Sequence, residues 1–144
     1  MNATIPSGLV PCDRQRILVT DDEAPVRDIF RMILASGFPA CHIDVAANGI
    51  EAVESFGESH HGVLLMDLKM PLMDGQTAFF KIRDVCNEKS WEMPAVIFCT
   101  GFAPSQNVRM LAATGQNYCL LQKPITSEIL LNTVKCHLPA ARSA

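Results

Sequence analysis

The chain has no C-x-x-C pair, although it contains six cysteines. Zinc sites and disulfide frameworks usually show such spacings, so we expect reduced thiols, with Cys99 and Cys119 inside apolar runs typical of strands. No apolar run approaches the ~20 residues that cross a bilayer. The N-terminal segment lacks a basic region and carries Pro6, Gly8 and Pro11, unlike a signal peptide. We therefore expect a cytoplasmic protein with no membrane partner.

The charge balance also gives no attraction for a polyanion. Twelve basic and fifteen acidic side chains leave a net charge of −3, so direct nucleic-acid binding is not expected. Hydrophobic residues make up 49% of the sequence and charged residues 19%, which excludes a disordered chain. A length of 144 residues indicates one folded domain over 14–138, with tails over 1–13 and 139–144.

Five short apolar runs predict five strands, each followed by a stretch with helical periodicity. The strands are expected over 16–20, 42–46, 63–66, 95–99 and 118–121. The helices are expected to begin at about Pro25, Gly49, Gly75, Pro104 and Thr126. The second helix is expected to end at Phe56, and a loop is expected over 57–62 with His60 and His61 exposed. This alternation predicts an α/β fold, a doubly wound parallel sheet with helices on both faces.

Polar residues stand where four of these strands end. Asp21 and Asp22 follow the first strand, Asp67 follows the third, Thr100 the fourth and Lys123 the fifth. The carboxyl ends of parallel strands meet at one edge of a sheet, where open α/β folds bind ligands. Three carboxylates repel one another unless a hard cation such as Mg²⁺ lies among their oxygens. With a lysine and a hydroxyl nearby they suit a phosphoryl group, and one carboxylate can be the nucleophile.

Taken in order, these motifs resemble those of the two-component response-regulator receiver domain. The matching pieces are Asp21-Asp22, Met66-Asp67 with Met70-Pro71-Leu72-Met73-Asp74-Gly75, Thr100-Gly101, Lys123-Pro124 and the turn at 46–52. The resemblance covers about 14–138 and implies a CheY-like, single-domain receiver with the flavodoxin-like strand order 2-1-3-4-5. It implies a signalling domain that assists its own phosphorylation and dephosphorylation, not an enzyme. A receiver cut from a larger hybrid kinase would show the same motifs.

The resemblance also implies a phosphoacceptor and a metal site. Asp67 would accept a phosphoryl group from a phosphohistidine on a histidine kinase or a histidine phosphotransfer protein. Mg²⁺ would be held by Asp21, Asp22, Asp67 and the backbone carbonyl of Lys69. Lys69, two positions after Asp67, would also tune the lifetime of the phosphoryl group. Taken alone, Asp21-Asp22-Glu23 could equally be a solvated turn with helix-capping acids.

Further roles follow from the same resemblance for the ends of the fourth and fifth strands. Lys123 would pair with Asp67 and then with the phosphoryl oxygens, and Thr100-Gly101 would bind those oxygens and act as the switch. Phe102, two positions after Thr100, would tune the phosphoryl lifetime. The Lys123-Pro124 bond would be cis. A downstream target protein would bind through about 104–137.

One position departs from the family pattern and keeps alternatives open. The aromatic residue expected three positions before the lysine is replaced by Leu120, and the nearest aromatic is Tyr118. Tyr118 is therefore either a surrogate switch or a packing residue. A receiver fold that acts as an unphosphorylated interaction module is one alternative. An aspartyl-phosphate hydrolase is another, although such enzymes place a second Asp where this chain has Lys69.

Overall fold

A computed structural model of the chain describes residues 15–101, 104–114 and 117–139. Five strands lie within these ranges: β1 (Arg16–Thr20), β2 (His42–Ala46), β3 (Val63–Asp67), β4 (Ala95–Thr100) and β5 (Tyr118–Gln122). Five helices alternate with them: α2 (Ala24–Gly37), α3 (Gly49–Ser59), α4 (Gly75–Lys89), α5 (Gln106–Thr114) and α6 (Ser127–His137). All five predicted strands are confirmed, and the last three extend one residue further than expected.

The strands form one sheet in the order β2-β1-β3-β4-β5, and each neighbouring pair is parallel. This is the expected strand order. β3 lies at the centre and every one of its residues is buried, as its unbroken apolar run predicts. Since all five strands run the same way, the residues that follow them gather at one edge of the sheet.

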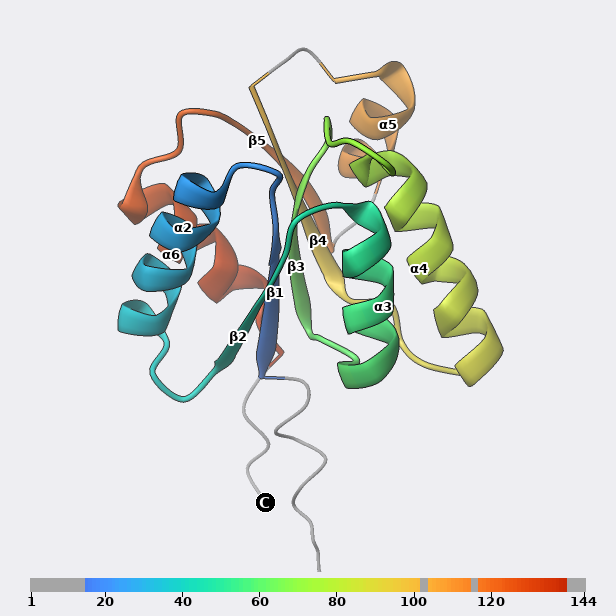
Figure 1. Ribbon diagram of the computed structural model, residues 1–144, viewed down its shortest axis with the longest axis horizontal. Coiled ribbons are helices and arrows are strands. Elements are labelled where there is room, and N and C mark those ends of the chain that lie inside the picture. Colours follow the sequence, from blue (N-terminus) through green and yellow to red (C-terminus); the bar gives the residue numbers. More distant parts are fainter. Residues whose placement is uncertain (1–14, 102–103, 115–116, 140–144) are drawn as a thin grey trace, which may run out of the picture.

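Helices cover both faces of the sheet (Figure 1). On one face α3, α4 and α5 pack over a cluster that includes Phe56, Phe79 and Phe98. On the other face α2 and α6 pack over a cluster that includes Leu34 and Leu130. The alternating side chains of the central strands point to the two clusters in turn, so the sheet separates two halves of the core.

Two helix boundaries and the burial of two histidines differ from the sequence prediction. α3 continues to Ser59, and the predicted loop over 57–62 is wrong for its first three residues. His60 ends this helix in a left-handed conformation, and its N–H donates to the carbonyl of Phe56 at 2.9 Å. α5 begins at Gln106 rather than at Pro104, because the Ser105 hydroxyl caps the helix by accepting a hydrogen bond from the N–H of Val108. The expected exposure of the two histidines is also wrong, because His61 is fully buried and His60 is half-buried.

The described cysteines are free thiols, in agreement with the sequence prediction. They are Cys41, Cys86, Cys99, Cys119 and Cys136; Cys12 lies outside the described residues. Burial raises the pKa of Cys41, Cys99 and Cys119, so these thiols are protonated near neutral pH and poorly reactive. Within the described part of the chain, no helix has the length and apolar character needed to cross a membrane.

Candidate functional site

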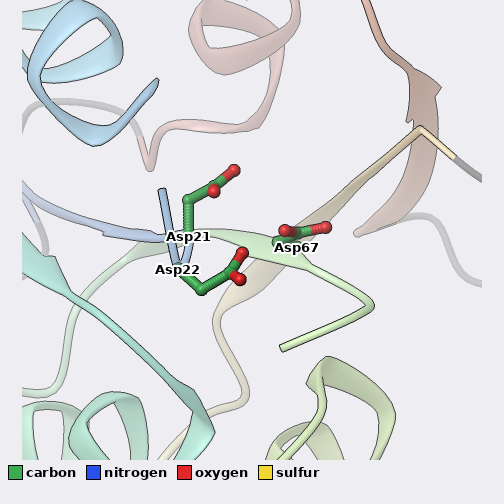
Figure 2. A group of neighbouring side chains, drawn as sticks. All are labelled: Asp21, Asp22 and Asp67. Carbon is green, nitrogen blue, oxygen red and sulfur yellow. The ribbon is translucent and has the colours of Figure 1, made fainter. Parts of the chain in front are cut away.

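Three carboxylates meet at the carboxyl edge of the sheet, as the sequence predicts (Figure 2). Asp21 and Asp22 directly follow β1, and Asp67 is the last residue of β3, which pairs with β1. One oxygen from each of the three side chains lies within 4.8 Å of the other two. Asp21 and Asp67 are buried and Asp22 is exposed, so the cluster opens to solvent on the Asp22 side.

The surroundings of Asp67 disfavour its charged form. Burial and the charge of Asp21 raise the pKa of Asp67 to about 6, with a smaller contribution from Asp22. The ammonium of Lys123 and the backbone N–H of Lys69 act in the opposite direction, since both stabilise the carboxylate. Oxygen donors of this kind are the ligands that Mg²⁺ prefers, and a divalent cation would offset the excess negative charge. The donor set therefore fits that ion.

Lys123 brings a cation to the carboxylates from the end of β5. Its Nζ lies 2.5 Å from Asp21 Oδ2 and 3.6 Å from Asp67 Oδ2. Burial lowers the pKa of Lys123, but the hydrogen bond to Asp21 and the charges of Asp21 and Asp67 outweigh this, so the pKa is raised. The lysine therefore stays charged. The peptide bond between Lys123 and Pro124 is cis.

The turn between β1 and α2 fixes the position of Asp21. The N–H of Glu23 donates to Asp21 Oδ1 at 2.9 Å, and Arg27 Nη1 donates to the backbone carbonyl of Asp21 at 2.7 Å. Arg27 was not identified from the sequence as part of the site. Its place one helical turn inside α2 is the local signal that could have suggested it, because a side chain there can reach back to the strand end.

The loop between β3 and α4 forms one wall of the site and is tightly packed. Asp74 caps α4, because its side chain accepts a hydrogen bond from the N–H of Thr77 at 2.8 Å. A side chain at Gly75 would place its Cβ 2.2 Å from the carbonyl oxygen of Asp67. Only glycine allows this close approach, so Gly75 lets α4 begin directly against the strand that carries the central carboxylate.

Two neighbouring cavities lie at this edge of the sheet, and Lys69 lines both of them. One of about 330 Å³ is lined by Asp22, Glu23, Asp67, Lys69, Gly101 and Lys123. A second, of about 440 Å³, is lined by Thr100 together with residues of α4, of the β3–α4 loop and of the start of α5. Thr100 is buried at the end of β4, and its carbonyl accepts the N–H of Lys123 at 2.8 Å. The first cavity therefore brings two lysines together with three carboxylates.

Comparison with known proteins agrees with this geometry. The family model for the response regulator receiver domain matches residues 17–135. The chain belongs to the response regulator receiver family. Receiver domains are signalling domains and generally bind Mg²⁺, and this receiver carries the acidic cluster over which such an ion can bind.

Relatives of this receiver domain include much longer proteins. It is 33% identical over 131 residues to hybrid signal transduction histidine kinase B of Dictyostelium discoideum, covering 85% of this chain and 6% of that protein. It is 29% identical over 123 residues to response regulator MprA of Mycobacterium ulcerans, covering 85% of this chain and 50% of that protein. The chain thus spans half or less of the length of these two curated relatives.

Solved structures share the fold. A CheY-like receiver domain protein of Methanospirillum hungatei superimposes with a TM-score of 0.69 at 25% identity, covering 83% of this chain and 90% of that one. Chemotaxis protein CheY4 of Vibrio cholerae gives a TM-score of 0.68 at 24% identity, covering 85% and 98%. The second similarity concerns the fold alone.

The structure places Tyr118 away from the end of the sheet that carries Thr100. Tyr118 pairs with Val96 on β4, four residues before Thr100, which corresponds to about 13 Å along a strand. Its ring packs edge-on against Phe79, with 5.3 Å between centroids. Leu120 pairs with Phe98 and is half-buried. Tyr118 therefore packs against the core cluster in this structure. Phe102 lies outside the described residues.

Sequence reasoning missed a second polar cluster, which lies toward the amino ends of β1 and β3 and includes a residue from the middle of β2. His61 Nε2 donates to Asp44 Oδ2 at 2.7 Å, and Arg16 Nη1 lies 3.5 Å from the same oxygen. Burial lowers the pKa of His61, although the hydrogen bond to Asp44 and its charge oppose this. These three residues come from β1, β2 and the turn before β3, so no local pattern in the sequence links them.

Proposed function

We propose that this receiver domain accepts a phosphoryl group on Asp67 from a phosphohistidine of a partner protein. An oxygen of Asp67 would attack the phosphorus, the phosphorus–nitrogen bond would break, and the donor imidazole would leave with the bonding electron pair and take up a proton. The observation that carries the proposal is the meeting of Asp21, Asp22 and Asp67 beside Lys123 at one edge of the sheet.

The residues around Asp67 have complementary tasks in this proposal. Asp21, Asp22, Asp67 and the backbone carbonyl of Lys69 would hold Mg²⁺, which supplies positive charge against the phosphoryl oxygens. Lys123 already contacts Asp67, so a small movement of its ammonium would let it bind a phosphoryl oxygen as well. The cation and the lysine together would offset the charge that the transfer brings into a cavity already rich in carboxylates.

Thr100 and Gly101 would respond to the new group. The hydroxyl of Thr100 would donate to a phosphoryl oxygen, and Gly101 lines the same cavity as Asp67. Thr100 lines the neighbouring cavity together with Ser105 and Val108, so a displacement of Thr100 would change the contacts at the start of α5. Lys69 and Phe102 would set how long the phosphoryl group persists, by controlling the access of water.

The output would be a change in protein–protein contacts. We propose that a histidine kinase or histidine phosphotransfer protein donates the phosphoryl group, and that a downstream target binds through 104–137, the region of α5, β5 and α6. In this proposal the receiver domain spans 14–138, works in the cytoplasm and has no substrate other than its phosphodonor. Since Leu120 replaces the usual aromatic residue, the signal would leave through Thr100 and α5 rather than through an aromatic side chain on β5.

A mass measurement tests the proposal. Incubation with Mg²⁺ and acetyl phosphate should add the mass of one phosphoryl group to the wild-type chain, and Asp67→Asn should abolish this gain. Lys123→Ala should slow it. Asp44→Asn is the matched control, because it changes a carboxylate at the opposite edge of the sheet and should leave labelling unchanged.

Other outcomes would contradict the phosphoacceptor role. No gain of mass in the wild-type protein would indicate a receiver fold that acts as an unphosphorylated interaction module. Rapid turnover of many small phosphoesters would indicate a hydrolase. Labelling that survives in Asp67→Asn would place the acceptor elsewhere.

A further inference from the structure

Leu72 is an exposed apolar residue in the loop between β3 and α4. Its side chain is 80% exposed, the highest value among the large hydrophobic residues that the structure describes as exposed. Its neighbours behave differently: Met70 is buried and Met73 packs against the core cluster under α3 and α4. The loop therefore places both methionines inside and Leu72 outside, where its side chain adds nothing to the core.

The backbone of Leu72 is also unfavourable for a leucine. Its φ is 69°, in the left-handed region where the Cβ of an L-residue approaches its own carbonyl oxygen. The other non-glycine residues with positive φ in the described ranges are His60 and Ser90. Both of those end a helix and donate a capping hydrogen bond. Leu72 lies instead in the middle of a loop, where the hydrogen bond from the N–H of Met73 to the carbonyl of Pro71 closes a three-residue turn around it and holds this conformation.

Hydrogen bonds hold the loop on both sides of Leu72. The N–H of Met73 donates to the carbonyl of Pro71 at 2.7 Å, and the N–H of Gly49 donates to the carbonyl of Met73 at 3.0 Å. The N–H of Gly75 closes the loop by donating to the carbonyl of Leu68 at 3.0 Å. A leucine on a fixed loop loses little conformational freedom when a partner covers it, which favours binding.

The position of the loop indicates which partner would cover it. The loop starts at Asp67 and rises above the carboxyl edge of the sheet, at the top of Figure 1. Any protein that delivers a phosphoryl group to Asp67 must close over this edge. Ile50 follows Gly49, the residue that bonds to Met73, and its side chain is 40% exposed. Two exposed apolar side chains thus stand on segments joined directly by a hydrogen bond.

We propose that Leu72, supported by Ile50, is an apolar anchor for the phosphohistidine-bearing partner and helps to determine which donor phosphorylates Asp67. The inference rests on the proposed function, because it requires a protein donor that reaches Asp67. An anchor of this kind acts on the docking of a protein. It has no role when the donor is a small molecule, since acetyl phosphate has no surface that reaches across the loop.

The test compares two kinds of donor on the same variants. The protein donor is chosen as the purified, autophosphorylated histidine kinase or phosphotransfer protein that labels the wild-type receiver most rapidly in a screen. Leu72→Asn tests the apolar side chain, because asparagine tolerates the left-handed conformation. Leu72→Gly removes the side chain and relieves the backbone. Ser90→Gly is the matched control, since it relieves a left-handed residue at the far end of α4.

Transfer from the protein donor should fall about tenfold in both Leu72 variants, as expected for loss of one anchor residue. Labelling by acetyl phosphate should not change, and the thermal midpoint of Leu72→Gly should equal or exceed that of the wild type. Ser90→Gly should keep both labelling rates. A merely structural role for Leu72 would instead lower the thermal midpoint.

Several results would overturn the anchor. The anchor is excluded if both Leu72 variants accept the phosphoryl group from the protein donor at the wild-type rate. If labelling by acetyl phosphate falls as much as transfer from the protein donor, Leu72 shapes the site itself. Self-association of the wild-type chain in sedimentation that both Leu72 variants abolish would identify a second copy as the occupant. If acetyl phosphate fails to label the wild-type chain, the proposed function fails first and the anchor fails with it.

Discussion

The two edges of the sheet each bury an ionisable residue, and burial favours the neutral form of both. At the carboxyl edge the neighbouring carboxylate of Asp21 adds to this effect, whereas at the amino edge the carboxylate of Asp44 opposes it. At the carboxyl edge Asp67 lies among other carboxylates, and burial together with Asp21 raises its pKa to about 6. At the amino edge the imidazole of His61 is fully buried, stacked on Phe56 and hydrogen-bonded to Asp44. Burial lowers the pKa of His61 and favours its neutral form.

This difference indicates that the carboxyl edge is a binding site, whereas the polar cluster at the amino edge stabilises the fold. The carboxyl edge contains more negative charge than Lys123 compensates, so a cation or a change of one carboxylate relieves it. The amino edge is balanced: Asp44 accepts from His61 and lies near Arg16, and its partly exposed carboxylate keeps contact with water. Replacing a charged residue at the carboxyl edge should therefore stabilise the protein, whereas replacing a residue of the amino-edge cluster should destabilise it.

The largest effect is expected at the amino edge. His61→Ala should lower the free energy of unfolding by about 3 kcal/mol, because it leaves a cavity beside Phe56 and removes a buried hydrogen bond to Asp44. Urea denaturation measures this loss. His42→Ala, at an exposed position on β2, is the control and should have little effect. Equal stability of the two variants would show that the buried imidazole does not support the fold.

The opposite sign is expected at the carboxyl edge. The pKa of Asp67 rises from 3.8 to about 6 on folding, with the attraction to Lys123 already included. This net shift corresponds to about 3 kcal/mol at neutral pH, and solvent screening on the open side of the cluster reduces it to about 2 kcal/mol. Asp67→Asn should therefore raise the free energy of unfolding by about that amount in magnesium-free buffer. Adding Mg²⁺ should narrow the gap, since the ion stabilises the wild type. A destabilised Asp67→Asn would contradict the charge argument.

The pH dependence of stability should have opposite signs at the two edges. His61 has a folded-state pKa below its ordinary value near 6.5. In an Asp67→Asn background, stability should therefore be complete above about pH 6.5 and fall as the pH is lowered through that value. The folded-state pKa of Asp67 is raised, so in a His61→Leu background stability should rise as the pH falls through about 6.

Unfolding curves at a series of pH values measure both slopes. One titrating group changes the free energy of unfolding by at most about 1.4 kcal/mol per pH unit. The remaining histidines and carboxylates are common to the two backgrounds, so the difference between the two curves reports the titration of His61 and Asp67 alone. Parallel curves would contradict the assignment of opposite shifts to His61 and Asp67.

The smallest effect is expected beside the buried histidine. The His60 ring stacks on Trp91 with 4.2 Å between centroids, and its Nε2 donates to the carbonyl of Glu92 at 2.9 Å. His60→Asn keeps a residue that tolerates the left-handed backbone and should lower the free energy of unfolding by about 1 kcal/mol. Trp91 is the single tryptophan, so its emission should shift to longer wavelength. Unchanged emission would contradict a close stack in solution.

The strands and the carboxylate site were predictable from the sequence because both depend on local order along the chain. Apolar runs bounded by turn residues placed β1 and β2 at their observed limits. Once the strands were known to be parallel, Asp21, Asp67 and Lys123 had to converge at one edge. The end of α3 was placed three residues too early, because Gly57 favours helix termination although the left-handed cap lies at His60.

The sequence by itself determined the fold class, the strand order implied by the family motifs, and the group of residues at the carboxyl edge. The tertiary structure alone decided which polar residues are buried elsewhere. The local sequence predicts that His61 is an exposed loop residue, but in the fold β1 and β2 place Arg16 and Asp44 around it. Register decided that Tyr118 faces Phe79, away from Thr100. Burial depends on neighbours distant in the chain, and no local pattern contains them.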